Sequence, residues 1–163
     1  MSLERISPVY FESVSAVTAT NSVELGSRRV DANGYEYVYC YNAGNSEVSP
    51  GFGVIVVTGL SGFSCTLTSV AAGKHDFIGV VRHATLSTAK YGWIMTKGYH
   101  TVESGADSTL TGVQYLALKA DGTFNNLISA QTGVLQERIV GMADADANTA
   151  SAGSFLAKII SGF

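Results

Sequence analysis

The chain has 163 residues, which is enough for one domain with a real hydrophobic core but not for two. Hydrophobic residues make up 46% of it and charged residues only 14%, which excludes intrinsic disorder and favours burial of some apolar surface against other chains. A net charge of -3 without a basic stripe argues against nucleic-acid binding, and no apolar stretch is long enough to span a membrane.

Residues 1–23 differ from the rest of the chain and show little sustained periodicity. Serine, threonine and asparagine punctuate this stretch, and Pro8 is incompatible with a helix there. We interpret it as an extended arm, strand-like around Val9–Phe11, that either frays or is ordered against a partner chain. The apolar side chains that favour the second alternative are Ile6, Val9, Tyr10, Phe11 and Val14.

From residue 24 onward the pattern is one of short strands and turns. Asn33-Gly34 is a strong hairpin signal because both residues tolerate positive φ, and it follows Arg28–Val30. The next run, Tyr35–Tyr41, alternates with period two. Its tyrosines share one face, which predicts cross-strand packing or, alternatively, a stacking platform for sugars or bases. These tyrosines are Tyr35, Tyr37, Tyr39 and Tyr41.

Further short strands are expected along the rest of the chain, separated by turn-forming residues. They are Val54–Thr58, Phe63–Val70, Phe77–His83, Gly92–Val102, Val113–Lys119, Thr123–Leu127, Leu135–Ala143 and Ser154–Ile160. Gly98 predicts a bulge or bend, and Ala120-Asp121-Gly122 predicts a hairpin turn. The best helical alternative, Ala130–Val140, is weakened by Gly133.

About nine short strands without crossover helices predict an all-β fold, either a sandwich or a partly open barrel. The expected organisation is an extended N-terminal arm over residues 1–23 and a single β-domain over residues 24–163.

One strand pattern occurs twice in the predicted domain. Ile78–Val81 precedes Trp93–Met95, and Val140–Ala143 precedes Phe155–Ala157 at the same spacing. Each copy reads as a buried strand, a small-residue loop and a second strand led by an aromatic residue. We therefore expect Trp93 and Phe155 to be core anchors of the two units.

Residues that could carry catalysis are sparse. His75, His83 and His100 show no paired spacing, and the sequence has no G-x-S-x-G elbow and no local carboxylate pair. We expect no enzyme activity. Cys40 and Cys65 fall inside strand-like runs, which favours buried free thiols over a disulfide framework.

The segment from residue 144 to residue 148 begins like a calcium loop. Thr149 and Phe155, however, stand where an EF-hand has its glycine and its bidentate glutamate. A polar loop without a cofactor is the expected reading, with a looser Ca²⁺ site as the weaker alternative. Its ligands would be Asp144, Asp146 and Asn148.

Several of these segments together resemble the small head proteins of tailed bacteriophages. The run Tyr35–Tyr41, followed by Ala43-Gly44 and by Val48–Gly51, is similar to the opening of such chains. Ile78–Val81 and Tyr91–Gly98 are similar to their central strands, and residues 140–160 to the C-terminal reprise. The similarity covers residues 24–163.

The resemblance implies a capsid decoration, or cement, protein on the outer surface of the virion. Such a protein binds the major capsid protein and its own sister chains, here as a homotrimer, and has no nucleic-acid or membrane partner. The alternative function is a virion-surface carbohydrate-binding module or adhesin with Ca²⁺ assistance. It would use an exposed face of tyrosines, or Trp93 together with Tyr91 and Tyr99.

Overall fold

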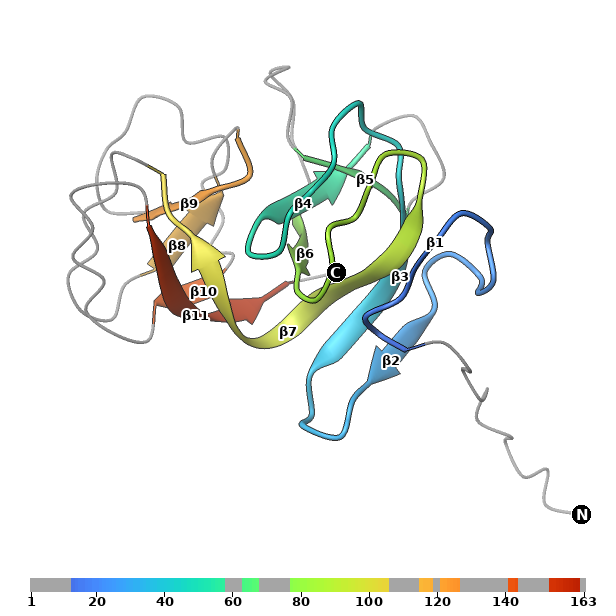
Figure 1. Ribbon diagram of the computed structural model, residues 1–163. Coiled ribbons are helices and arrows are strands. Elements are labelled where there is room, and N and C mark those ends of the chain that lie inside the picture. The colour runs from blue at the N-terminus through green and yellow to red at the C-terminus, as the bar shows by residue number, and fades with distance from the viewer. Residues whose placement is uncertain are drawn as a thin grey trace, which may run out of the picture.

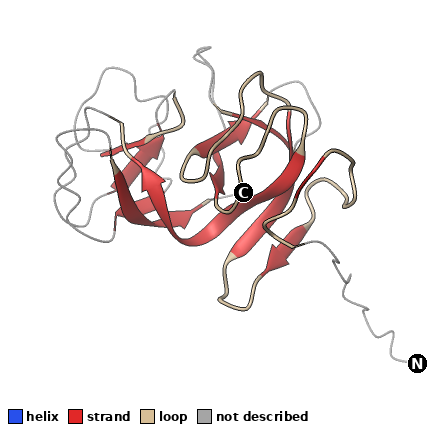
Figure 2. Ribbon diagram, in the orientation of Figure 1, coloured by secondary structure: helices blue, strands red, loops and turns tan. Residues whose placement is uncertain are grey.

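The computed structural model describes residues 13–57, 63–67, 77–105, 115–118, 121–126, 141–143 and 153–161. Within these ranges the chain forms eleven β-strands and no helix, so the expected all-β class is confirmed (Figure 2). The longest strand, β7 (Tyr91–Glu103), runs across the molecule and takes part in two sets of strands (Figure 1).

A closed ring of five strands forms the first set. Its members are β3 (Glu36–Asn42), β5 (Ser64–Thr66), β4 (Gly53–Val56), β6 (Phe77–Val81) and the first half of β7, which pairs with β3 again. The β3–β5 pair is parallel and the other four pairs are antiparallel. One buried cluster belongs to this ring: Val38, Cys40, Val48, Val54, Cys65, Ile78, Val81, Leu86 and Ile94.

The second half of β7 begins the second set. There β7 pairs with β11 (Ser154–Ile160), followed by β10 (Gly141–Ala143), β8 (Tyr115–Leu118) and β9 (Phe124–Asn126). A bridge between Ser104 and Phe124 brings β9 back beside the end of β7. The larger core cluster joins both sets: Tyr37, Tyr39, Ile55, Phe77, Val80, Trp93, Met95, Val102, Leu116, Leu118, Phe124, Phe155, Ala157 and Ile159.

An irregularity in β7 decides which of its side chains face this core. Glu36 pairs with Lys97 but Tyr37 pairs with Met95, so Thr96 is an extra residue in β7. The extra residue shifts the alternation by one position. As a result Met95 before it and Val102 after it lie in the same core cluster, although their spacing is odd.

Gly98 follows the irregularity and has a φ of 139°. A Cβ atom at this position would lie 2.5 Å from Cδ1 of Tyr35, so the tyrosine ring packs directly against the glycine backbone. The sequence predicted a bulge or bend at Gly98. The bulge itself lies at Thr96, and Gly98 provides the unusual backbone conformation.

Both predicted hairpins are present. In the first, β2 (Arg28–Val30) pairs with β3, and Gly34 rather than Asn33 adopts a positive φ. The carbonyl of Asp31 accepts a hydrogen bond of 3.0 Å from the N–H of Gly34. In the second hairpin β8 pairs with β9, and Gly122 has a φ of 80°.

The described end of the predicted arm lies against its own chain. Here β1 (Val17–Thr18), which the sequence did not predict, pairs with β7 at Gly92 and Tyr91. Val14 and Val23 pack against the larger core cluster. The other four arm residues, Ile6, Val9, Tyr10 and Phe11, lie outside the described residues.

The two copies of the repeated strand pattern both form antiparallel pairs, β6 with β7 and β10 with β11. In the first copy Val80 pairs with Met95, whereas in the second Met142 pairs with Lys158, which corresponds to Thr96. The two registers therefore differ by one residue, and the repeat is one of topology rather than of detailed pairing.

Candidate protein-binding surface

Five large apolar side chains of the described residues are exposed, and all five lie on one face of the sheet. Their exposed fractions are 63% for Val30, 40% for Tyr99, 47% for Tyr115, 44% for Leu156 and 43% for Ile160. Singly exposed apolar residues are ordinary on any protein surface, whereas a contiguous group indicates an interaction site.

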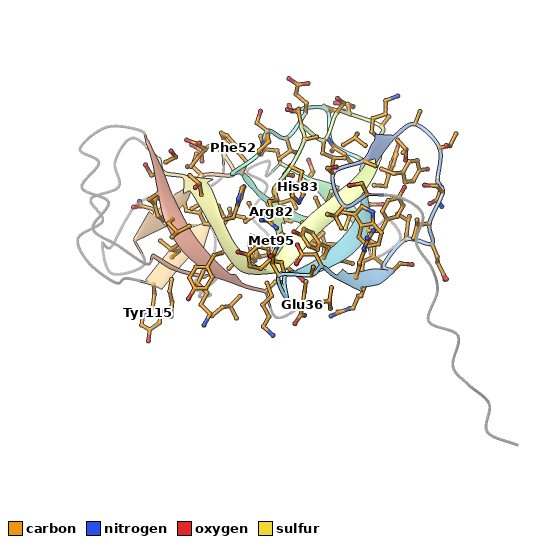
Figure 3. All side chains as sticks on the ribbon, turned by 60° about the horizontal axis from the view of Figure 1, so that its bottom comes forward. Glu36, Phe52, Arg82, His83, Met95 and Tyr115 are labelled. Carbon is orange, nitrogen blue, oxygen red and sulfur yellow. The ribbon has the colours of Figure 1, made fainter. Side chains whose placement is uncertain are left out.

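Strand register brings these side chains together, because directly opposed residues of antiparallel strands project to the same side. One row crosses β2, β3, β7 and β11, and the next crosses β7, β11, β10 and β8. The first row is Val30, Glu36, Lys97 and Ile160; the second is Tyr99, Lys158, Met142 and Tyr115; Thr101 and Leu156 begin a third. We call these ten residues the outer face. Figure 3 shows Glu36 and Tyr115 projecting from the same side of the molecule.

The two sides of β11 differ in burial, yet both of them carry large apolar side chains. Phe155, Ala157 and Ile159 are buried, while Leu156, Lys158 and Ile160 alternate with them and are exposed. Ser154 is exposed on the same side, so two of the four exposed residues are aliphatic. A strand that faces water on one side ordinarily carries polar residues there, so this pattern indicates a side meant to be covered.

Two lysines on the outer face have different surroundings. Lys97 Nζ lies 2.8 Å from Glu36 Oε1 in an ion pair on the surface. Lys158 Nζ lies 6.0 Å from the centroid of the Tyr99 ring, at the outer limit of a cation–π contact. Lys158 makes no ion pair with any residue in the described ranges.

The tyrosines of β3 are mostly buried rather than displayed. Tyr37 is 1% exposed and Tyr39 0% exposed, and the Tyr39 ring lies 5.1 Å from the Trp93 ring. The Tyr39 hydroxyl is satisfied by Thr18 Oγ1 and by Ser22 Oγ, each at 3.2 Å. Cross-strand packing is therefore the role of these rings, and an exposed platform that includes Tyr37, Tyr39 or Trp93 is excluded.

The predicted anchors are both in the core, where Trp93 and Phe155 belong to the larger cluster. The weak calcium candidates Asp144, Asp146 and Asn148 lie outside the described residues. Cys40 and Cys65 are free and buried, as expected. Burial and the hydrogen-bonded Cys65 thiol raise the pKa of Cys40 well above its usual value.

A cluster of polar side chains lies beside the β2–β3 turn. Arg82 Nη1 contacts the Tyr37 hydroxyl and lies 3.4 Å from Asp31 Oδ2, and its guanidinium stands 4.3 Å above the Tyr35 ring. The Tyr37 hydroxyl donates to Asp31 Oδ2 at 3.1 Å. His83 Nε2 lies 3.4 Å from the same hydroxyl. The cluster ties the turn to the end of β6.

The pKa values of three groups in and near this cluster are shifted by burial, by hydrogen bonds and by the Arg82 charge. Burial raises the pKa of Asp31, but hydrogen bonds from the N–H groups of Tyr35 and Asn33 outweigh it, and the net pKa lies below its usual value. Burial and the Arg82 charge lower the pKa of His83. Burial, Arg82 and His83 lower the pKa of His100 from 6.5 to about 4.

The fold thus brings two of the three histidines near one arginine, which their sequence spacing did not indicate. His75 lies outside the described residues. In the described part of the chain no three His, Cys, Asp or Glu side chains are grouped so that they could hold a metal ion. The arrangement of Asp31, Tyr37 and Arg82 is that of a structural network.

Sequence reasoning missed the outer face. The aliphatic residues on both sides of β11 are a local signal for it, but the approach of Tyr99 and Tyr115 depends on the register of four strands.

Among the described residues no helix is long and apolar enough to be a membrane span. No known family model matches the chain, and no curated protein matches it significantly.

Proposed function

We propose that the protein decorates and stabilises the capsid of a tailed bacteriophage and that it binds the major capsid protein through its outer face. It does so from the outer surface of the virion as a homotrimer. The observation that carries this proposal is the exposed apolar face of β7, β11, β10 and β8, because a surface of this kind is suited to protein–protein contact.

The placement of the segments that resemble phage head proteins supports the proposal. Tyr35–Tyr41 runs into β3, Ile78–Val81 lies in β6, and Tyr91–Gly98 is the first part of β7. These are adjacent strands of the first ring, so the resemblance concerns the framework of the fold. The outer face is built mainly by the second half of β7 and by the strands that follow it.

Decoration needs only modest affinity from each copy. The patch of four apolar side chains that are each 40–47% exposed, Tyr99, Tyr115, Leu156 and Ile160, corresponds to roughly a few hundred Å² of apolar surface, about the size of functional patches on single proteins. Several copies joined in one oligomer bind a repeating lattice with an avidity far above that of a single contact. A homotrimer could therefore bind three equivalent sites of the capsid lattice at once.

The proposal is tested by co-sedimentation of the purified protein with emptied heads of the tailed phage that encodes it. We expect saturable binding that is lost when Tyr115 and Leu156 are both replaced by serine. A control replaces Ser46 and Glu47, two exposed polar residues that follow the end of β3 and are not among the ten residues of the outer face. Failure of the wild-type protein to bind heads would overturn the proposal.

Mass in solution tests the oligomeric part. Sedimentation equilibrium is expected to give three times the chain mass of 17.1 kDa. A carbohydrate-binding function has less support, because Trp93 and two of the β3 tyrosines are buried. Head binding that is abolished by EDTA or by soluble glycans would contradict decoration and favour the carbohydrate-binding function.

A further inference from the structure

We propose that Lys158 on the outer face receives a carboxylate from the bound partner, so that the occupant of this face is a protein surface with an acidic side chain amid apolar residues. This inference rests on the proposed function, since it specifies the chemistry of the capsid surface that the face binds.

Lys158 lies in the middle of the apolar part of the outer face. Tyr99 lies directly across from it on β7, and Met142 lies directly across on β10. Along its own strand, Leu156 precedes it and Ile160 follows it on the same side. A lysine in this position can lay its carbon stem along apolar neighbours while its ammonium stays in water.

The electrostatic surroundings distinguish Lys158 from the other lysine of the outer face. Lys97 already has a carboxylate partner in Glu36, at 2.8 Å. Lys158 has only the face of the Tyr99 ring, at 6.0 Å, and forms no ion pair within the described ranges. An incoming partner therefore meets one cation that is already paired and one cation that has no ion-pair partner among the described residues.

Covering the outer face removes water from the Lys158 ammonium. A buried and unpaired charge is strongly unfavourable, so a partner that covers the apolar ring has to supply a negative group at its centre. An apolar surface without an acid, or one with a basic residue at that point, is rejected. Lys158 thus acts as a selector among apolar surfaces, while the surrounding side chains provide the contact area.

The test measures binding of single variants to emptied phage heads. Lys158→Met keeps the apolar stem and removes the charge, and we expect its affinity to fall about 10- to 100-fold. Lys158→Glu is expected to bind still more weakly. Lys90→Met is the control, with a change below about threefold, because Lys90 precedes the first half of β7 and is not one of the ten residues of the outer face.

Cross-linking provides a direct readout. A carbodiimide joins a lysine amine to a carboxylate in contact with it and leaves no spacer. Treated complexes are expected to yield a peptide in which Lys158 is linked to an Asp or Glu of the capsid protein. Lys158→Arg keeps the positive charge and binding, but it is expected to lose this cross-linked peptide because a guanidinium does not form the amide.

The outcomes separate the two proposals. If the wild-type protein fails to bind heads, the proposed function is overturned together with this inference. If the wild-type protein binds and Lys158→Met binds within threefold of it, only the role of Lys158 is overturned. If Lys158→Met dissociates the oligomer instead, or if Lys158 is cross-linked to a sister chain, the occupant is a second copy and the assignment to capsid is wrong. All variants are expected to keep the wild-type melting temperature, because the Lys158 side chain is exposed.

Discussion

The first half of β7 is buried on both sides and the second half on only one, although both belong to one continuous strand. Residues 92–96 are all buried, because one side of this half contributes to the core of the first ring and the other to the core shared with the second. In residues 97–103 the core-facing side is covered, while Lys97, Tyr99 and Thr101 on the other side are exposed. The bulge at Thr96 marks the change.

Exposure on the second half of β7 therefore depends on position in the fold and not on residue type. Tyr39 and Tyr99 are the same residue type, yet Tyr39 is fully buried and Tyr99 is 40% exposed. The first half has a buried core cluster on each side. The second half has one layer, and its bare side is the outer face.

The largest expected effect on stability comes from truncating a core side chain of β11, compared with truncating its exposed neighbour on the same strand. Phe155→Ala is expected to lower the free energy of unfolding by about 3–5 kcal/mol, since the side chain is buried in the larger cluster. Leu156→Ala, its neighbour, is expected to change stability by less than about 1 kcal/mol because the side chain is exposed. Urea unfolding of both variants measures this, and similar losses would contradict the division between the two sides.

A smaller effect is expected where the two halves of β7 meet. Gly98→Ala combines a strained φ of 139° with a clash against the Tyr35 ring, at a cost of roughly 2–3 kcal/mol. Gly34→Ala is the matched control: its φ of 78° is also strained, but no atom lies within 4 Å of the added methyl group. Thermal unfolding is expected to rank Gly98→Ala as the less stable variant.

Acidification tests the covered side of the second half. The pKa of His100 is lowered from 6.5 to about 4, so the unfolded chain binds this proton more readily than the folded protein. Stability from the neutral imidazole is therefore present above pH 6.5 and is lost as the pH falls from about 6.5 towards 4, by on the order of 1–3 kcal/mol.

The control for this prediction is His100→Gln, which cannot take up the proton. Unfolding free energies measured from pH 7 to pH 4.5 are expected to fall more steeply for the wild-type protein than for the variant. Parallel curves would show that His100 is not the group responsible. His83, whose pKa is also lowered, contributes in the same direction in both proteins.

The smallest effect is expected in the core of the first ring, where the rate of thiol modification is measured. Cys40 and Cys65 are fully buried, and the pKa of Cys40 is raised, so little thiolate is available to react. An aromatic disulfide reagent at pH 8 is expected to modify native protein far more slowly than protein in urea. Rapid modification of both thiols without denaturant would indicate that the ring opens readily.

The local elements could be predicted from the sequence, because their signals depend on neighbouring residues only. Gly34 and Gly122 marked the two hairpins, and the strand expected over Ser154–Ile160 is β11. The all-β class followed from these signals. The tyrosines of β3 were recognised as one face, but the sequence could not decide between packing and display.

The pairing of distant strands could not be predicted from the sequence, because it depends on contacts between residues that are far apart in the chain. The parallel β3–β5 pair closes the first ring. The extra residue Thr96 shifts the alternation of β7 by one position, so that even-numbered instead of odd-numbered residues face the core after it. The rows of the outer face then arise from register between strands that are far apart in sequence, such as β8 and β11, each of which pairs with β10. A shift of one residue in any of these pairs would have turned the affected side chains to the other side, which is why the position of Lys158 among apolar neighbours could not be inferred from residue types alone.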